Sequence, residues 1–203
     1  DLTYTVSSDA SHGSVIISGS YATYTPDEFY NGSDTFTFNV DDGAGGSDQS
    51  EVGITIDAVN DAPVLATLSN VSFDEDGSDI LELSASDIDE DDLTYSVTGG
   101  TDISSVLDGT TITFSAPADY NGSENFTITV EDSGELTDSQ IITVTVNAVN
   151  DAPIAQADIS GEGDEDQSIS VLLSGSDVDG DVLSYSITDP ANGTVELSGA
   201  TVV

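Results

Sequence analysis

The chain has 203 residues, of which 40 are Asp or Glu and none is Lys or Arg, so its formal net charge is −40. Without cationic side chains it cannot displace counterions from a nucleic acid or bind an anionic membrane surface, so neither is an expected partner. A single His and no Cys leave no constellation for a catalytic triad or a zinc site, and we predict that the protein is not an enzyme.

The sequence repeats itself at a domain-sized spacing. Residues 58–63 and 148–153 both read AVNDAP, which is an offset of 90 residues. Residues 30–43 (YNGSDTFTFNVDDG) recur at the same offset as 120–133 (YNGSENFTITVEDS). A unit of this length has the size of an autonomous β-sandwich domain and is long for a solenoid repeat.

The prolines that end the two AVNDAP segments set the phase of the repeat. They divide the chain into a first repeat (residues 1–61, the C-terminal part of a domain), a second repeat (62–151, complete) and a third repeat (152–203, the N-terminal part of a domain). The first linker then lies around residues 57–63 and the second linker around residues 147–153. These three boundaries are predictions from the sequence match alone.

The second repeat has the pattern of seven short strands without a helical stretch. Turn residues such as Gly-Gly at 99–100 and Asn-Gly at 121–122 separate runs in which β-branched and aromatic residues alternate with polar ones. Within one run, Phe126, Ile128 and Val130 share a face, as do the apolar residues of 142–146. The expected strands are 64–71, 78–85, 92–98, 103–106, 110–116, 124–132 and 137–147. The prediction is an all-β chain of tandem Greek-key β-sandwich domains joined end to end.

Acidic residues gather in the predicted turns and linkers. The clusters are DED (74–76, 164–166), the alternating Asp residues of 87–91 and 177–181, and the Asn-Asp pairs of the linkers. Two carboxylates about 5 Å apart repel by about 3 kcal/mol at an effective dielectric constant of about 20. Solvated acidic turns, or protonation at raised pKa values, would each relieve this repulsion. A divalent cation is the simpler remedy, and oxygen ligands at alternate positions favour calcium over magnesium or zinc.

These motifs, taken together and in order, resemble the cadherin-like tandem repeats of large bacterial surface proteins, including RTX-type adhesins. The segments that carry the resemblance are DEDGS, SDIDEDDLTYSV, DYNGSENFTITVEDSG and VNAVNDAPI. The resemblance covers the whole chain and implies that its domains are cadherin/Ig-like sandwiches of seven strands. In that family the junction between two domains binds calcium through an early Glu, an acidic pair before the sixth strand, the linker, and an Asp-x-Asp of the next domain.

Carried over by position, the resemblance gives a set of expected metal ligands at each junction. At the first junction they are Asn31, Asp57, Asn60, Asp61, Asp87, Asp89 and Asp132. At the second junction they are Glu75, Asp119, Asn121, Asn147, Asn150, Asp151, Asp177 and Asp179. At equivalent positions the repeats depart from each other twice, because Phe29 stands where Asp119 does and Asn147 replaces the acid at Asp57. Glu75 is expected only in the second set and Asp132 only in the first.

The resemblance also implies a function. We expect about two to three calcium ions at each junction, and an extender segment that calcium rigidifies within a secreted or cell-surface adhesin. Its partners would be calcium, the neighbouring repeats and like chains in a fibre. The alternative is a ligand-binding or self-assembling module that uses its loops or Thr-rich strand faces. No apolar run reaches the roughly 20 residues of a membrane span.

Overall fold

The computed structural model describes residues 1–198, and these contain strands and loops but no helix. The expected all-β fold class is thereby confirmed. The last five residues of the third repeat lie outside the described part. Contacts along the chain divide it into two compact units. Unit 1 contains residues 1–67, 84–96 and 129–140, and unit 2 contains 68–83, 97–128 and the chain from Ile141 onward. Each unit therefore contains one linker with the segments around it.

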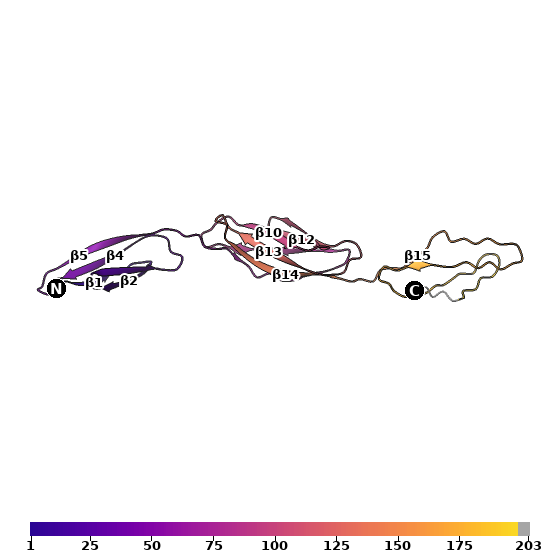
Figure 1. Cartoon of the computed structure of the whole chain (residues 1–203), viewed down its shortest axis with the longest axis horizontal. Helices are drawn as coiled ribbons and strands as arrows, with labels where there is room; N and C mark the ends of the chain where they lie inside the picture. The colour runs from indigo at the N-terminus through magenta and orange to yellow at the C-terminus, as the bar shows by residue number, and fades with distance from the viewer. Residues whose placement is uncertain (199–203) are drawn as a thin grey trace. The chain divides into compact units, whose positions relative to one another are not determined.

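The first repeat has five strands in two sheets. They are β1 (Thr3–Ser8), β2 (Gly13–Ser18), β3 (Tyr21–Pro26), β4 (Gly32–Asp41) and β5 (Ser47–Ile56). One sheet has the order β1-β4-β5, and β2 pairs with β3 in the other (Figure 1). The antiparallel pairing of β4 with β5 runs unbroken from Gly32 opposite Ile56 to Asp41 opposite Ser47. This long hairpin leads directly into the first linker.

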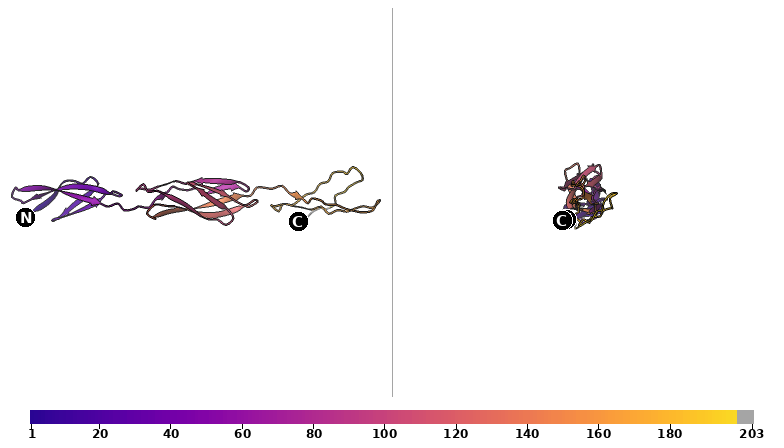
Figure 2. Two further views of the ribbon diagram at one scale, coloured as in Figure 1. Left: turned by 90° about the horizontal axis from the view of Figure 1, so that it is seen from above. Right: turned by 90° about the vertical axis from the view of Figure 1, so that its right-hand side faces the viewer.

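The second repeat has nine strands. They are β6 (Val64–Leu65), β7 (Val71–Asp74), β8 (Ser78–Glu82), β9 (Ala85–Ser86), β10 (Thr94–Gly99), β11 (Ser104–Asp108), β12 (Thr111–Ser115), β13 (Gly122–Glu131) and β14 (Thr137–Asn147). One sheet has the order β10-β13-β14-β7 and the other β11-β12-β8, and the two layers are visible in the left view of Figure 2. Phe114 of β12 and Phe126 of β13 meet edge to face between the layers, with ring centroids 5.0 Å apart.

Two of the expected strands are divided in the structure. The expected strand 64–71 is a strand only at β6 and at Val71, where β7 begins, and β7 continues beyond it to Asp74. The break arises because β6 pairs antiparallel with β9 whereas β7 pairs parallel with β14. The segment 78–85 likewise gives β8 and β9. Leu65 and Val71 are both buried, so the chain changes partner strands while it continues to fill the core. In the third repeat the described strands are β15 (Ile154–Ala155) and β16 (Gly175–Ser176), which pair antiparallel.

The predicted alternation of the core strands is confirmed. Phe126, Ile128 and Val130 of β13 are at most 1% exposed, and the apolar residues at 142, 144 and 146 of β14 are equally buried. The residues between them are Thr, which the alternation places on the other face of the sheet. This core fixes the ends of β13 and β14, from which the acidic loops and the second linker extend.

Some carboxylates inside the repeats anchor loops through backbone N–H groups. Asp34 of β4 is buried and accepts hydrogen bonds from the backbone N–H groups of Ser11 (3.0 Å) and His12 (2.9 Å) and from the Tyr24 hydroxyl (3.0 Å). Burial alone would raise the pKa of Asp34, but these bonds outweigh it and lower the pKa to about 2. Glu124, the equivalent residue of the second repeat, accepts from the backbone N–H groups of residues 101–103.

Candidate metal sites at the two linkers

The two linkers make the same contact with the acidic loop that follows each of them. The backbone N–H of Asp61 donates to Oδ2 of Asp89 at 2.8 Å, and that of Asp151 donates to Oδ2 of Asp179 at 2.7 Å. The repeated sequence therefore folds locally in the same way at both places. One carboxylate oxygen of each loop is fixed to the linker backbone, which brings the linker and loop carboxylates together.

The first Asp of each acidic loop shapes that loop. Asp87 Oδ1 accepts a hydrogen bond from the N–H of Asp89 at 2.8 Å, and Asp177 Oδ1 accepts from the N–H groups of Asp179 and Asp181, both at 3.1 Å. Such bonds from an Asp side chain to backbone N–H groups further along the chain are typical of turns. The spacing that predicted oxygen ligands thus has a definite local structure.

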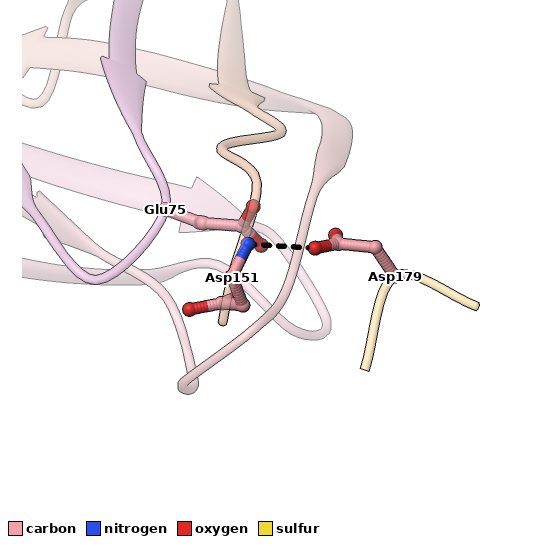
Figure 3. Close-up of side chains that lie close together, drawn as sticks. All are labelled: Glu75, Asp151 and Asp179. Carbon is pink, nitrogen blue, oxygen red and sulfur yellow. Dashed lines mark hydrogen bonds between the residues drawn. The ribbon is translucent and has the colours of Figure 1, made fainter. Parts of the chain in front are cut away.

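Three carboxylates from distant parts of unit 2 meet at the second linker. They come from Glu75 after β7, Asp151 in the linker and Asp179 in the third repeat (Figure 3). One oxygen from each lies within 4.8 Å of the others. Glu75 is only 7% exposed, and its Oε1 accepts a hydrogen bond from the backbone N–H of Val149 in the linker. We call this group the inner triad.

A second group of three carboxylates shares Asp151 with the first. Asp76, Asp119 and Asp151 offer oxygens that also lie within 4.8 Å of one another, and we call this group the outer triad. The backbone N–H of Asp119 lies 3.4 Å from Oδ1 of Asp76, to which it donates. Asp76 and Asp119 both have left-handed backbones, with φ of 61° and 58°. Asp tolerates this conformation better than most residues, because its short polar side chain can hydrogen-bond locally.

The electrostatics of the second linker follow from this crowding. Partial burial raises the pKa of Asp151, and the negative charges of the other four carboxylates in the two triads raise it further. The chain has no Lys or Arg with which to neutralise them. A cation from solution is therefore the only positive charge available to this site other than a proton.

The first linker has a more open arrangement. Asn31, Asp57, Asp61 and Asp89 line one cavity of about 340 Å³ in unit 1, and the lining also includes Asp27, Glu28 and Phe29. Among residues 1–198, no three carboxylates around this linker approach one another as closely as the triads do. The positions equivalent to Glu75 and Asp76 would fall 90 residues earlier, before Asp1, so the two linkers are not described with the same set of groups.

Asp132 is tied to the first linker by a different kind of contact. Its Oδ2 accepts a hydrogen bond from Nδ2 of Asn60 at 2.9 Å, and its Oδ1 accepts from the N–H groups of Gly134 and Leu136. Burial favours the neutral acid, but these donors outweigh burial and lower the pKa of Asp132. Asp132 thus stays ionised while it holds the linker Asn in place.

The donor sets fit a hard divalent cation. All the converging side-chain atoms are carboxylate oxygens, which calcium prefers and which zinc and copper prefer less than nitrogen or sulfur. Near the first linker, Oδ2 of Asp87 is buried and has no hydrogen-bond partner in the described part of the chain. A buried, unsatisfied carboxylate oxygen is costly in protein and water alone, and a metal ion would satisfy it.

The remaining expected ligands occupy varied places. Asn150, Asp151 and Asp177 line one cavity of about 310 Å³ at the second linker. Asn147 instead donates its Nδ2 to Ser72 and Asp74, each at 3.2 Å, and Asn121 is exposed just before β13. The role of every one of these residues as a ligand stays a prediction.

Three acidic residues outside the expected ligand sets lie at the linkers in the structure. Asp76 completes the outer triad, and Asp27 and Glu28 line the cavity at the first linker. The DED motif contained a signal for Asp76, since the same triplet recurs at 164–166. No signal distinguished Asp27 or Glu28, because the second repeat has Pro117 and Ala118 at their positions.

Comparison with protein families gives one assignment for the whole chain. The model of the bacterial Ig domain matches it three times, over residues 1–55, 60–145 and 150–203. No curated protein sequence matches the chain. In the described residues, no helix has the length and apolar character needed to span a membrane.

Solved structures of cadherin ectodomains are similar in fold. Extracellular domains 1–5 of protocadherin gamma B2 give a TM-score of 0.58 at 18% identity, covering 87% of this chain and 39% of that one. Domains 1–4 of protocadherin gamma B7 give 0.52 at 20% identity, with coverages of 98% and 56%. The EC22-24 segment of mouse cadherin-23 gives 0.52 at 16%, with coverages of 87% and 65%.

The chain spans less than two thirds of the length of each of these structures. At such identities the likeness concerns the fold alone. Together with the family match, it confirms the expected resemblance to cadherin-like tandem repeats.

Proposed function

The chain belongs to the bacterial Ig domain family, and on that premise we propose that it is an extender segment of a secreted or cell-surface adhesin, made rigid by calcium at its linkers. Tandem domains of this family and fold indicate an extracellular structural module, typically without enzymatic activity. Beyond that assignment, we propose that calcium binds at the linkers, that it makes the segment rigid and that the protein acts in adhesion. The observation that carries it is the pair of carboxylate triads that share Asp151.

The inner triad joins two repeats that are otherwise connected through the linker. Glu75 comes from the loop after β7 in the second repeat, and Asp179 comes from the third repeat. A cation bound by the inner triad would therefore hold three separate pieces of backbone together. A cation bound by the outer triad would attach the loop that precedes β13 to the same linker residue. Two ions per junction account for both groups, at the lower end of the expected two to three.

Calcium suits these groups better than magnesium does. Calcium accepts six to eight oxygen ligands in flexible geometry, and linker carbonyls and Asn side chains can complete the shell around each triad. Magnesium requires a near-ideal octahedron and keeps several of its waters. Binding would stabilise the folded junction by mass action, by about 4 kcal/mol when free calcium is about 1,000 times Kd.

In a tandem array each domain interacts chiefly with its neighbours, so stiffness is set junction by junction. A junction without calcium would combine a flexible linker with mutually repelling carboxylates. With calcium, the same residues would hold adjacent repeats in one orientation. We therefore infer that the segment works as a structural rod between a cell surface and a distal module.

The test is small-angle scattering combined with thermal unfolding of the full chain in calcium and in EDTA. We expect EDTA to lower Tm substantially and to reduce the radius of gyration as the linkers become flexible. Asp179→Ala should loosen only the second junction, and Asp89→Ala only the first.

Asp108→Ala is the matched control, because Asp108 is an exposed acid at the end of β11 that belongs to neither set of expected ligands and to neither triad. It should respond to calcium as the unmodified chain does. A radius of gyration and a melting curve that chelation leaves unchanged would refute the proposal.

A further inference from the structure

One hairpin of the first repeat carries none of the negative charge of this chain. Residues 10–26, which contain both β2 and β3, form the longest stretch of the sequence without Asp or Glu. The exposed residues of β2 are Ser14, Ile16 and Ser18, and the side chain of Ile16 is 68% exposed. The hairpin therefore presents an uncharged surface in a protein whose surface is otherwise rich in carboxylates.

The strand β2 is also the edge of its sheet. Within residues 1–198 it pairs with β3 alone. The equivalent strand of the second repeat, β11, likewise lies at the edge of a sheet, in the order β11-β12-β8. The edge position is therefore common to both repeats. An edge strand presents backbone N–H and C=O groups that have no strand partner, and another strand can pair with them.

β2 lacks the features that usually protect an edge strand from such pairing, which are charged side chains, Pro and bulges. Its sequence, GSVIIS, has no charged residue and no Pro, and its pairing with β3 keeps one register throughout. Other edge strands differ from it. Asp108 ends β11, and the pairing of the edge strand β1 with β4 is interrupted between Val6 and Ser8.

From these observations we propose that β2 pairs antiparallel with β2 of a second copy of this chain, which joins the two first repeats into one continuous sheet. Two chains of net charge −40 repel each other, so they can approach closely only where the contact brings no carboxylates together. Two acid-free edges meet this condition. Because the same strand is used on both chains, the contact is two-fold symmetric and closes as a dimer.

The alternation of β2 restricts the register of this pairing. Val15 and Ile17 are half-buried on the inner face, whereas Ile16 is on the outer face. The cores of both chains lie on the same side of the joined sheet only if outer residues pair with outer residues. Among such registers, the one centred on Ile16 places the two exposed Ile side chains directly opposite each other, where they stabilise the pair.

The contact involves no carboxylate, so it does not depend on the calcium proposed at the linkers. It should instead strengthen with ionic strength, because salt screens the repulsion between the two acidic chains. The Debye length falls from about 10 Å at 0.1 M salt to about 3 Å at 1 M. A contact along one short strand buries little surface, so the association is weak and reversible.

The experiment is disulfide crosslinking of single-Cys variants of the full chain in EDTA, at low and at high NaCl with oxidised glutathione. The chain has no Cys of its own, so each variant carries one thiol. Ile16→Cys should form a disulfide-linked dimer, and faster at high NaCl, because directly paired residues of antiparallel strands have Cα atoms about 4.5–5.5 Å apart, within the reach of a disulfide.

Ile141→Cys is the matched control. Ile141 is 71% exposed, but it lies in β14 between β13 and β7, which leaves no free edge there. Its variant should crosslink at least about tenfold more slowly than Ile16→Cys, since no pairing holds the two thiols within the span of a disulfide. Equal rates for the two variants would overturn the proposal.

Ile16→Asp tests the same contact without a thiol. It places two carboxylates opposite each other, so the Kd of the dimer at high NaCl, measured by sedimentation equilibrium, should rise at least about tenfold. Because Ile16 is exposed, Tm should stay unchanged. A dimer that this variant leaves intact, a dimer that needs calcium, or a chain that stays monomeric at millimolar concentration in high NaCl would each overturn the proposal.

Discussion

Asp34 and Asp151 show the two ways in which this chain accommodates its acidic groups. Asp34 lies inside the first repeat, where backbone N–H groups and one hydroxyl surround it and its pKa falls to about 2. Asp151 lies at the second linker, where partial burial and four other carboxylates raise its pKa. A protein without Lys or Arg can thus satisfy an acid such as Asp34 by protein donors, whereas under the proposed function the carboxylates crowded around Asp151 would be neutralised by a cation from solution.

The same comparison applies to the second repeat alone. Glu124 anchors the loop of residues 101–103 entirely through backbone N–H groups, and these bonds outweigh the effect of burial and lower its pKa. Glu75 accepts one backbone hydrogen bond at the linker and otherwise faces Asp151 and Asp179. Glu124 thus stabilises a loop within its own repeat, whereas Glu75 belongs to the candidate metal site at the linker.

Replacement of Asp151 should give the largest effect and the clearest contrast. Asp151→Asn removes the charge that both triads share, so most of the calcium-dependent rise in Tm should disappear. In EDTA the same variant should be more stable than the unmodified chain, because one of the repelling charges has gone. Calorimetry in both buffers measures the two values, and a loss of stability in EDTA would contradict this account of the second linker.

Glu124→Gln should give a smaller effect that does not depend on calcium. The loop N–H groups lose a charged acceptor, which should lower the free energy of unfolding by about 1–3 kcal/mol in calcium and in EDTA alike. Chemical denaturation in the two buffers provides the measurement. A loss seen only in calcium would mean that Glu124 acts at the metal sites, and the distinction between the two kinds of carboxylate would fail.

The smallest effect is that of pH, and it should have opposite signs at the two places. A raised pKa at Asp151 contributes stability that is present below the ordinary value of 3.8 and is lost as the pH rises through the folded value. A lowered pKa at Asp34 contributes stability that is present above 3.8 and is lost as the pH falls towards about 2.

Hydrogen exchange in EDTA can separate these two trends. After correction for the intrinsic exchange rate, the backbone amide of Asp151 should exchange more slowly in mild acid than at neutral pH. The amides of Ser11 and His12, which donate to Asp34, should keep their protection until the pH falls below about 3.8. A parallel response of both regions would show that their carboxylates are held in the same way.

Much of the fold followed from the sequence because its period-two pattern is local. Phe126 and Ile128 are buried where the alternation of β13 placed them. The break between β6 and β7 could not be predicted from the sequence, because the pattern of residues 64–71 does not indicate which strand each part pairs with. The resemblance to cadherin-like repeats placed Asp61 and Asp89 at one junction, whereas their hydrogen bond and the position of Asp76 in the outer triad are seen only in the folded chain.

The loop anchors could not have been found from the sequence. Asp34 is one acid among 40, and its backbone donors lie 22 and 23 residues earlier in the chain. Every non-proline residue carries a backbone N–H, so the donors that distinguish Asp34 from an exposed acid have no signature in the sequence. Only the folded chain separates the acids that protein donors satisfy from those, such as Asp151, that lie among other carboxylates.

A crystal structure of the full chain grown in calcium would show directly whether metal binds at the second linker. We expect two metal peaks beside Asp151, one bound by Glu75 and Asp179 and the other by Asp76 and Asp119, with oxygen distances of about 2.3–2.6 Å. Water alone between these carboxylates, in crystals grown at millimolar calcium, would contradict this expectation.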